Sequence, residues 1–166
     1  MATSERRKTQ ITMPTDREIV VTRIFDAPRE LVWEMWTEAK HLKHWWGPKG
    51  WSLPVCEVDF RPGGEWFYCM QGPDMLSCGK AVYTEIVKPE RFGYKDMFVD
   101  ADGSLLEGMP VAESTARFIE RGGATLVTNS TTYATKAERD KVIEMGVEEG
   151  IDQTLDRLEA YLETLK

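Results

Sequence analysis

The chain has 166 residues, of which 42% are apolar and 30% are charged, and its formal net charge is −7. This length and composition predict one globular domain with a core of its own. The acidic balance argues against a protein that binds nucleic acid or anionic membranes without sequence preference, and the chain has no run of about 18 apolar residues that would predict insertion into a membrane.

The N-terminal segment and the cysteines bear on the compartment. Residues 1–15 contain basic side chains but no apolar stretch behind them, which argues against a secretory signal. Three cysteines without a C-x-x-C pair do not form a disulfide framework. Both features predict a cytoplasmic location.

The first elements follow a segment without regular patterning. Residues 1–16 are expected to form an extended or flexible tail, and the domain is expected to span 17–166. Residues 17–25 are rich in β-branched side chains and predict a strand. Residues 29–46 have apolar positions at helical spacing, with a break expected near residues 38–40, so they predict two short helices.

The middle of the chain, residues 52–133, predicts strands only. Strand-length runs at 53–60, 65–71, 76–87, 91–99, 110–120 and 124–133 are separated by glycine- and proline-rich turns. Because the connections are short, neighbouring runs are expected to pair antiparallel in a meander.

The closing segment, residues 136–165, predicts one long amphipathic helix. Val147, Ile151 and Leu155 are spaced by four residues and so share a face. Gly146 and Gly150 lie on or beside that face, and each would cost about 1 kcal/mol relative to alanine in a helix interior. We therefore expect another backbone or a bound molecule to come close at the glycines. The order of elements predicts an α+β domain with its helices on one face of an antiparallel sheet.

The inner face of the predicted sheet is unusually small and hydroxylic. A two-residue turn at Gly122-Gly123 would place Ala116 opposite Asn129 and Ser114 opposite Thr131. Such a face predicts a cavity with a few polar anchors under the helix, and a tight contact between helix and sheet is the alternative. The candidate ligand-binding residues are Trp45, Trp46, Phe60, Phe67, Cys69, Val82, Phe98, Ala116, Asn129, Tyr133, Met145, Gly146 and Gly150. For each large apolar member, a place in the core explains the residue equally well.

The cysteines and histidines are candidate ligand sets. Turn symmetry would align Cys56, Cys69 and Cys78 across three strands, which favours a structural role, with redox chemistry or a soft-metal site as the alternative. No fourth ligand is evident, so neither a metal nor a cofactor is predicted. His41 and His44 lie three residues apart on a predicted helix, where surface or capping roles are expected.

Catalytic motifs are absent from the sequence. It contains no G-x-S-x-G elbow, P-loop or G-x-G-x-x-G segment. Lys80, Glu85 and Asp96 alternate with apolar residues, so each could face either the cavity or the solvent. A buried one would have a shifted pKa and would be a catalytic candidate. No catalytic residue is assigned.

Five segments, in order, resemble a known family. They are Phe25-Asp26-Ala27-Pro28 with Val32-Trp33 and Trp36-Thr37, Trp45-Trp46-Gly47-Pro48, Asp59-Phe60-Arg61-Pro62-Gly63-Gly64, Glu85 to Arg91, and Gly146 to Gly150 followed by Gln153 to Leu158. This pattern is similar to the START-like SRPBCC superfamily, in particular to its bacterial branch that resembles the C-terminal domain of the heat-shock-protein ATPase activator. The resemblance implies a helix-grip fold, in which a curved antiparallel sheet of six or seven strands wraps around a long C-terminal helix and leaves an apolar cavity.

The resemblance leaves three functional hypotheses. The first is a binding or carrier protein for a small hydrophobic, cyclic molecule. The second is an enzyme of the cyclase or hydrolase type on the same scaffold, which requires at least two titratable groups in the cavity. The third is a module that contacts a chaperone partner through its surface. Homodimerisation through an edge strand or the N-terminal segment is left open.

Overall fold

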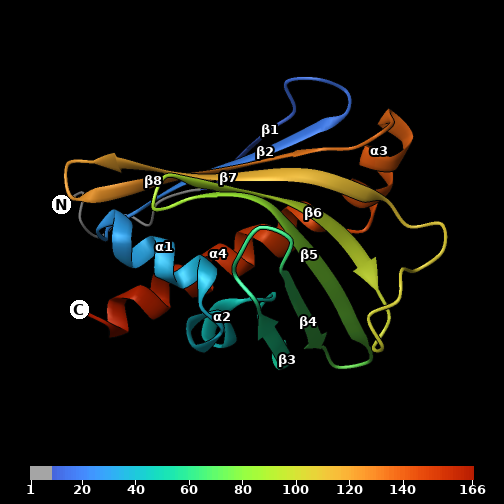
Figure 1. The fold of residues 1–166 in the computed structure, drawn as a ribbon, viewed down its shortest axis with the longest axis horizontal. Helices are drawn as coiled ribbons and strands as arrows, with labels where there is room; N and C mark the ends of the chain where they lie inside the picture. Colours follow the sequence, from blue (N-terminus) through green and yellow to red (C-terminus); the bar gives the residue numbers. More distant parts are fainter. Residues whose placement is uncertain (1–8) are drawn as a thin grey trace.

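The computed structural model describes residues 9–166, which form one sheet of eight strands and four helices (Figure 1). In chain order the elements are β1 (Gln10–Thr12), β2 (Glu18–Phe25), α1 (Arg29–Thr37), α2 (Ala39–Trp45), β3 (Ser52–Val58), β4 (Glu65–Gln71), β5 (Leu76–Val87), β6 (Arg91–Val99), β7 (Val111–Arg121), β8 (Ala124–Thr132), α3 (Lys136–Glu144) and α4 (Val147–Thr164). The predicted α+β class is confirmed.

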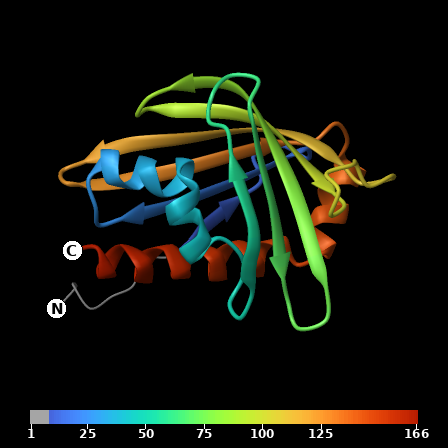
Figure 2. The ribbon, with the colours of Figure 1, turned by 60° about the horizontal axis from the view of Figure 1, so that its bottom comes forward.

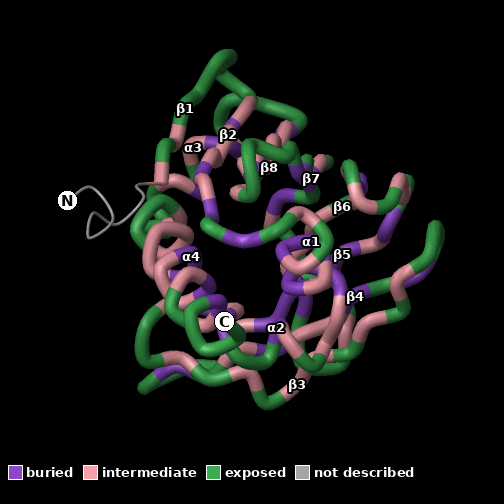
Figure 3. Tube along the Cα trace, turned by 90° about the vertical axis from the view of Figure 1, so that its left-hand side faces the viewer, coloured by how far each residue is buried: buried purple, intermediate pink, exposed green. Residues whose placement is uncertain are grey.

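The sheet is antiparallel throughout, with the strand order β1-β2-β8-β7-β6-β5-β4-β3. From β3 to β8 it is the predicted meander, and β2 joins it beside β8. Figure 2 shows α4 running along the open side of the curved sheet. In Figure 3, which looks along the molecule, the strands curve around α4 and much of the buried chain faces inward. This is the helix-grip arrangement that the resemblance implies.

The N-terminal segment differs from the expected tail. Residues 10–12 form β1, which pairs antiparallel with β2 from Gln10 opposite Thr22 to Thr12 opposite Val20. Ile11 packs against a small buried cluster that contains Ile19 and Val142, and this apolar contact explains why the segment is ordered. The rest of the predicted tail, residues 1–8, lies outside the described part of the chain.

The predicted break in the first helical segment is present. α1 ends at Thr37, and Glu38 has an extended backbone (φ −114°, ψ 128°) before α2 begins. The bend lets Trp45 fold back onto α1, where its indole nitrogen donates a hydrogen bond to the carbonyl oxygen of Met35 at 3.1 Å. Trp45 is therefore fully buried.

The closing segment is two helices rather than the predicted single one. α3 ends at Glu144, and α4 begins after Gly146, whose φ of +85° lies in the left-handed region. Glycine adopts this conformation without the steric cost that a Cβ brings. Gly146 thus turns the chain between two helices, and the expected cost of a glycine inside a helix does not apply there.

Polar contacts attach α4 to the rest of the fold. Arg23 of β2 is buried, and its guanidinium donates to Asp156 and Glu159 of α4 at 2.8 and 2.9 Å. On the other side, Arg157 donates to the carbonyl oxygen of Gly47 at 2.8 Å. Because Arg23 binds the C-terminal half of α4, and Arg157 of α4 binds the loop after α2, this half of the helix is held against both the sheet and that loop.

Candidate ligand-binding cavity

A cavity of about 350 Å³ lies between the concave face of the sheet and the N-terminal half of α4. Side chains of β2, β4, β6 and β8 line it on the sheet side. Val142 of α3 and residues of α4 such as Ile151 and Leu155 line it on the helix side. The loop after α2 closes one end with Trp46 and Pro48. This size and apolar lining are typical of small-molecule sites.

Seven of the predicted site residues line this cavity: Trp46, Phe98, Asn129, Tyr133, Met145, Gly146 and Gly150. They come from the loop after α2, from β6, from the end of β8 and from the junction of α3 with α4. The structure therefore brings together side chains from segments about a hundred residues apart. Their role in binding stays a prediction.

Three predicted residues belong to the core instead of the cavity wall. Trp45, Phe60 and Ala116 all pack in the main cluster between the sheet and the helices. The Phe60 ring lies against Trp33 at a centroid distance of 5.7 Å. Ala116 is fully buried and lies beneath this aromatic packing. These residues pack against aromatic side chains of the core, and none of the three lines the cavity.

Three further predicted residues lie on the face of the sheet that points away from the cavity. Phe67 and Cys69 of β4 alternate with Tyr68, which lines the cavity, and Val82 of β5 follows Ala81 of the main core. Successive side chains of a strand point to opposite faces of the sheet. Phe67, Cys69 and Val82 therefore lie on the convex face.

The predicted pairing of β7 with β8 is correct and supplies polar anchors. Gly122 and Gly123 both have positive φ, and Ala116 lies opposite Asn129 and Ser114 opposite Thr131. The hydroxyl groups of Ser114 and Thr131 are 2.8 Å apart, and Thr131 donates to the side-chain oxygen of Asn129 at 3.4 Å.

Two tyrosines that were not predicted from the sequence complete the wall. The amide nitrogen of Asn129 donates to the hydroxyl of Tyr94 at 2.9 Å, which extends the polar row onto β6. Tyr68 of β4 lies over Gly79 of β5, where an added Cβ would overlap the tyrosine ring. Tyr94 could have been found from its spacing, because it lies four residues before Phe98 and so shares its face.

Asp96 carries the only charge among the described residues that line the cavity. It lies on β6 between Ala81 of β5 and Ala112 of β7, so its neighbours on both strands are small and apolar. Burial raises the pKa of this carboxyl to about 6, and a hydrogen bond from the backbone of Met97 opposes part of that rise. The other two charged candidates lie elsewhere: Lys80 donates to the carbonyl oxygen of Gly103, and Glu85 pairs with Arg91 at the surface.

Comparisons with known proteins agree with this fold. The sequence profile described as activator of Hsp90 ATPase homolog 1-like protein matches residues 26–163. The chain belongs to this family. No curated protein matches it.

Solved structures share the whole domain. Protein Ms6760 from Mycobacterium smegmatis is 30% identical, with 93% of this chain and 96% of that one covered, at a TM-score of 0.87. A protein from Staphylococcus epidermidis is 32% identical, with 95% of each chain covered, at a TM-score of 0.82. A third, from Arthrobacter aurescens, is 27% identical, with 93% of this chain and 91% of that one covered, at a TM-score of 0.86. The helix-grip fold of this member of the activator-like family is thereby confirmed.

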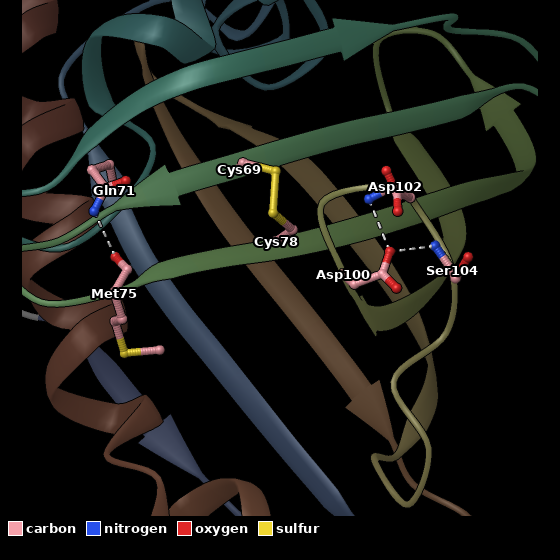
Figure 4. The surroundings of a disulfide bond; sticks show 7 residues. All are labelled: Cys69, Gln71, Met75, Cys78, Asp100, Asp102 and Ser104. Atoms are coloured by element: carbon pink, nitrogen blue, oxygen red, sulfur yellow. Dashed lines mark hydrogen bonds between the residues drawn. A yellow bond between two sulfur atoms is a disulfide. The ribbon is translucent and has the colours of Figure 1, made fainter.

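The predicted alignment of the three cysteines is wrong for Cys56. Cys69 and Cys78 lie opposite each other on β4 and β5 and form a disulfide (Figure 4). Cys56 lies opposite Tyr68, because the pairing of β3 with β4 is shifted by one residue from that of a turn centred on Pro62-Gly63. A slip of one residue moves a side chain to the other face, so Cys56 keeps a free thiol on the concave side.

Both histidines of this protein, His41 and His44, contact Tyr161 of α4. His44 stacks on Tyr161 of α4 at 4.8 Å between ring centroids, and the His41 ring nitrogen Nδ1 is 2.8 Å from the Tyr161 hydroxyl. His41 also forms, with Glu34 and Glu38, a group whose potential ligand atoms lie within 4.8 Å of one another. This group is on α1 and α2 and does not line the cavity. Carboxylates gather in this way on many surfaces that hold no metal.

No helix in residues 9–166 is both long enough and apolar enough to span a membrane.

Proposed function

We propose that this protein binds a small, largely apolar and cyclic molecule in the cavity between the sheet and α4. The cavity itself carries the proposal. Its volume of about 350 Å³ suits a molecule of one to three rings, and most of its lining is apolar. Thr131, Asn129 and Tyr94 offer hydroxyl and amide groups at one wall, which would orient such a molecule.

The arrangement of α4 supports this proposal. Arg23 and Arg157 hold the helix from its middle onward, while Gly146 and Gly150 border the cavity at its N-terminal end. Val147 and Ile151 leave space beneath them that side chains of the sheet do not fill. An apolar cavity of this kind gains free energy when an apolar molecule replaces weakly bound water.

A thermal-shift experiment tests the proposal, with 2-isobutylnaphthalene as the apolar probe. At ten times its dissociation constant a ligand adds about 1.4 kcal/mol to the unfolding free energy, so Tm should rise by about 3–6 °C. The variant Ile151→Trp places an indole in the cavity and should abolish the shift. Ala160→Trp makes the same kind of change on an exposed part of α4 and should leave it intact.

The folded state of both variants is checked by circular dichroism without ligand. A Tm that does not move for the wild type with this or any other apolar ring compound would contradict the proposal. Equal shifts in the wild type and in a folded Ile151→Trp variant would place binding outside the cavity.

The chaperone hypothesis has weaker support. The family description names activation of an ATPase, which would require a contact surface. The most exposed large apolar side chains of the described residues, Leu105, Met75 and Met145, come from three separate segments. Binding to a chaperone that survives Leu105→Ser and Met75→Ser, and that is lost on filling the cavity, would still favour the cavity as the functional site.

A cytoplasmic location is also part of the proposal. It rests on three cysteines that lack a C-x-x-C pair, an argument that the Cys69–Cys78 disulfide does not support. The disulfide between Cys69 and Cys78 makes this location testable, because a reducing compartment keeps such thiols free.

A further inference from the structure

Among the described residues, the cavity has one charged side chain and no compensating charge. Asp96 is the only acidic or basic residue among the described residues that line it. No lysine, arginine or histidine of residues 9–166 lies within ion-pair distance of its carboxylate. A partly buried carboxylate without a cation is unfavourable, and proteins usually pair such groups.

Aromatic rings share the wall with this carboxylate. Tyr94 and Phe98 lie two residues on either side of Asp96 along β6, so all three side chains point to the concave face. Tyr68 and Tyr133 line the same cavity from β4 and from the end of β8. The faces of aromatic rings attract cations, most strongly where water is excluded. The carboxylate and the rings therefore both favour a cationic group on the ligand.

We propose that the bound molecule carries a protonated amine on its apolar body, and that this amine pairs with Asp96. This inference rests on the proposed function and specifies its ligand class as apolar organic cations. The amine would supply the cation that the cavity lacks, while its ring system occupies the apolar space under Val147 and Ile151. An anionic ligand of the same shape would be repelled by Asp96, and none of the lining residues within 9–166 is basic.

Three probes of nearly equal shape test the ligand class by isothermal titration calorimetry at pH 7.5. They are 2-(dimethylaminomethyl)naphthalene, which is a cation, the neutral 2-isobutylnaphthalene, and the 2-naphthylacetate anion. We expect the amine to bind about tenfold to a hundredfold more tightly than the hydrocarbon, as for a hydrogen bond to a charged group, and the anion to bind most weakly.

The variant Asp96→Asn keeps the size of the side chain and removes its charge. It should lower the affinity for the amine to about that for the hydrocarbon, and it should leave the binding of the hydrocarbon unchanged. Asp102→Asn removes an exposed carboxylate from the turn after β6 and should preserve the preference for the amine. This control separates the local effect of Asp96 from the change in net charge.

The pH dependence gives an independent readout. Tyr68, Tyr94 and Tyr133 are the titratable side chains that interact with Asp96, and burial raises the pKa of each, so all three stay neutral between pH 5 and 8. The residues of β2, β5, β7, α3 and α4 that line the cavity carry no charge. Because Asp96 gains its proton near pH 6, the amine should bind about tenfold more weakly at pH 5 than at pH 7.5, and the hydrocarbon should not change.

The outcomes separate the two proposals. If the hydrocarbon binds as tightly as the amine, or if Asp96→Asn retains the preference, the inference about the amine is wrong while the cavity still binds apolar molecules. If none of the three probes binds, both proposals are overturned.

Discussion

Asp96 links the charge of the cavity wall to the free energy of unfolding of the protein. Its carboxyl group lies between alanines of the neighbouring strands, and burial raises its pKa from 3.8 to about 6. The folded chain therefore holds this proton more tightly than the unfolded chain does. Between about pH 4 and pH 6 the contribution of Asp96 to the free energy of unfolding falls as pH rises, because the folded state holds this proton more tightly.

Replacing Asp96 by Asn should therefore stabilise the protein without ligand. We expect the free energy of unfolding to rise by up to about 3 kcal/mol at pH 8 and to change little below pH 4. Urea unfolding of the wild type and of Asp96→Asn across this range measures the difference. An equal difference at pH 4 and pH 8 would show that the ionised carboxylate is not the cause.

The residues of the wall show which parts of the site were predictable. Asn129 and Tyr133 followed from the Gly122-Gly123 turn, because that turn type fixes the register of the two strands. Asp96 could have been placed too, since it lies two residues before Phe98 and must share its face. Phe67 and Val82 were predicted to line the cavity only because they are apolar. The alternation of side chains along their strands instead puts both on the convex face.

At the scale of elements, the α3–α4 junction explains the two glycines differently. Gly146 needs a left-handed backbone, with φ of +85°, although no neighbouring atom lies within 4 Å of the position that a Cβ would take there. Gly150 lies inside α4, where an added Cβ would meet only Pro48 Cγ at 3.7 Å, an ordinary contact. Glycine is thus needed at position 146 for its left-handed backbone, whereas at position 150 its missing side chain leaves space beside the helix.

The substitutions Gly146→Ala and Gly150→Ala should have opposite effects. Gly146→Ala should lower the free energy of unfolding by about 1 kcal/mol through backbone strain. Gly150→Ala should raise it by up to about 1 kcal/mol, because alanine favours the helix and the space is sufficient. Thermal and urea unfolding of the pair measure both changes. Destabilisation of similar size by both would contradict the assignment of Gly146 as the turn between helices.

Most element boundaries were predictable, and the two exceptions have physical reasons. The turns between β3 and β8 carry strong glycine and proline signals, so the six strands fall where the sequence places them. The apolar spacing of residues 136–165 hardly changes across Gly146, so it predicts one helix where the backbone turns. β1 escapes prediction because three residues, Gln10–Thr12, are too few for an alternation to be recognised.

At the scale of the molecule, the sheet separates two environments. Its concave face and α4 enclose the cavity, which Cys78 also lines beside Gly79, while the Cys69–Cys78 disulfide packs with Val99 in a small cluster separate from the main core. The disulfide joins β4 to β5 within the sheet, beside the hydrogen bonds that already pair these strands. It should therefore contribute to stability without shaping the ligand site.

Reduction of the disulfide should lower the free energy of unfolding by about 1–3 kcal/mol and leave the affinity for 2-isobutylnaphthalene unchanged. Urea unfolding and calorimetry with and without a reductant measure these quantities, with Cys56→Ser as the control that removes the free thiol. A large loss of affinity on reduction would show that the two faces are coupled.

The same cysteines report the compartment. Alkylation of thiols under denaturing conditions in cells quenched with acid, followed by mass spectrometry, should label Cys69 and Cys78 if the protein resides in a reducing cytoplasm. Protection of both from labelling would indicate an oxidising compartment and contradict the proposed location.

The most direct test of ligand binding in the cavity is a methyl NMR titration of the wild type with 2-isobutylnaphthalene. We predict saturable shifts for the methyl groups of Val21, Val147 and Ile151, which line the cavity, and none for Ile119 on the exposed face of β7. Absence of shifts at the three cavity residues, or shifts confined to exposed methyl groups, would contradict the proposal.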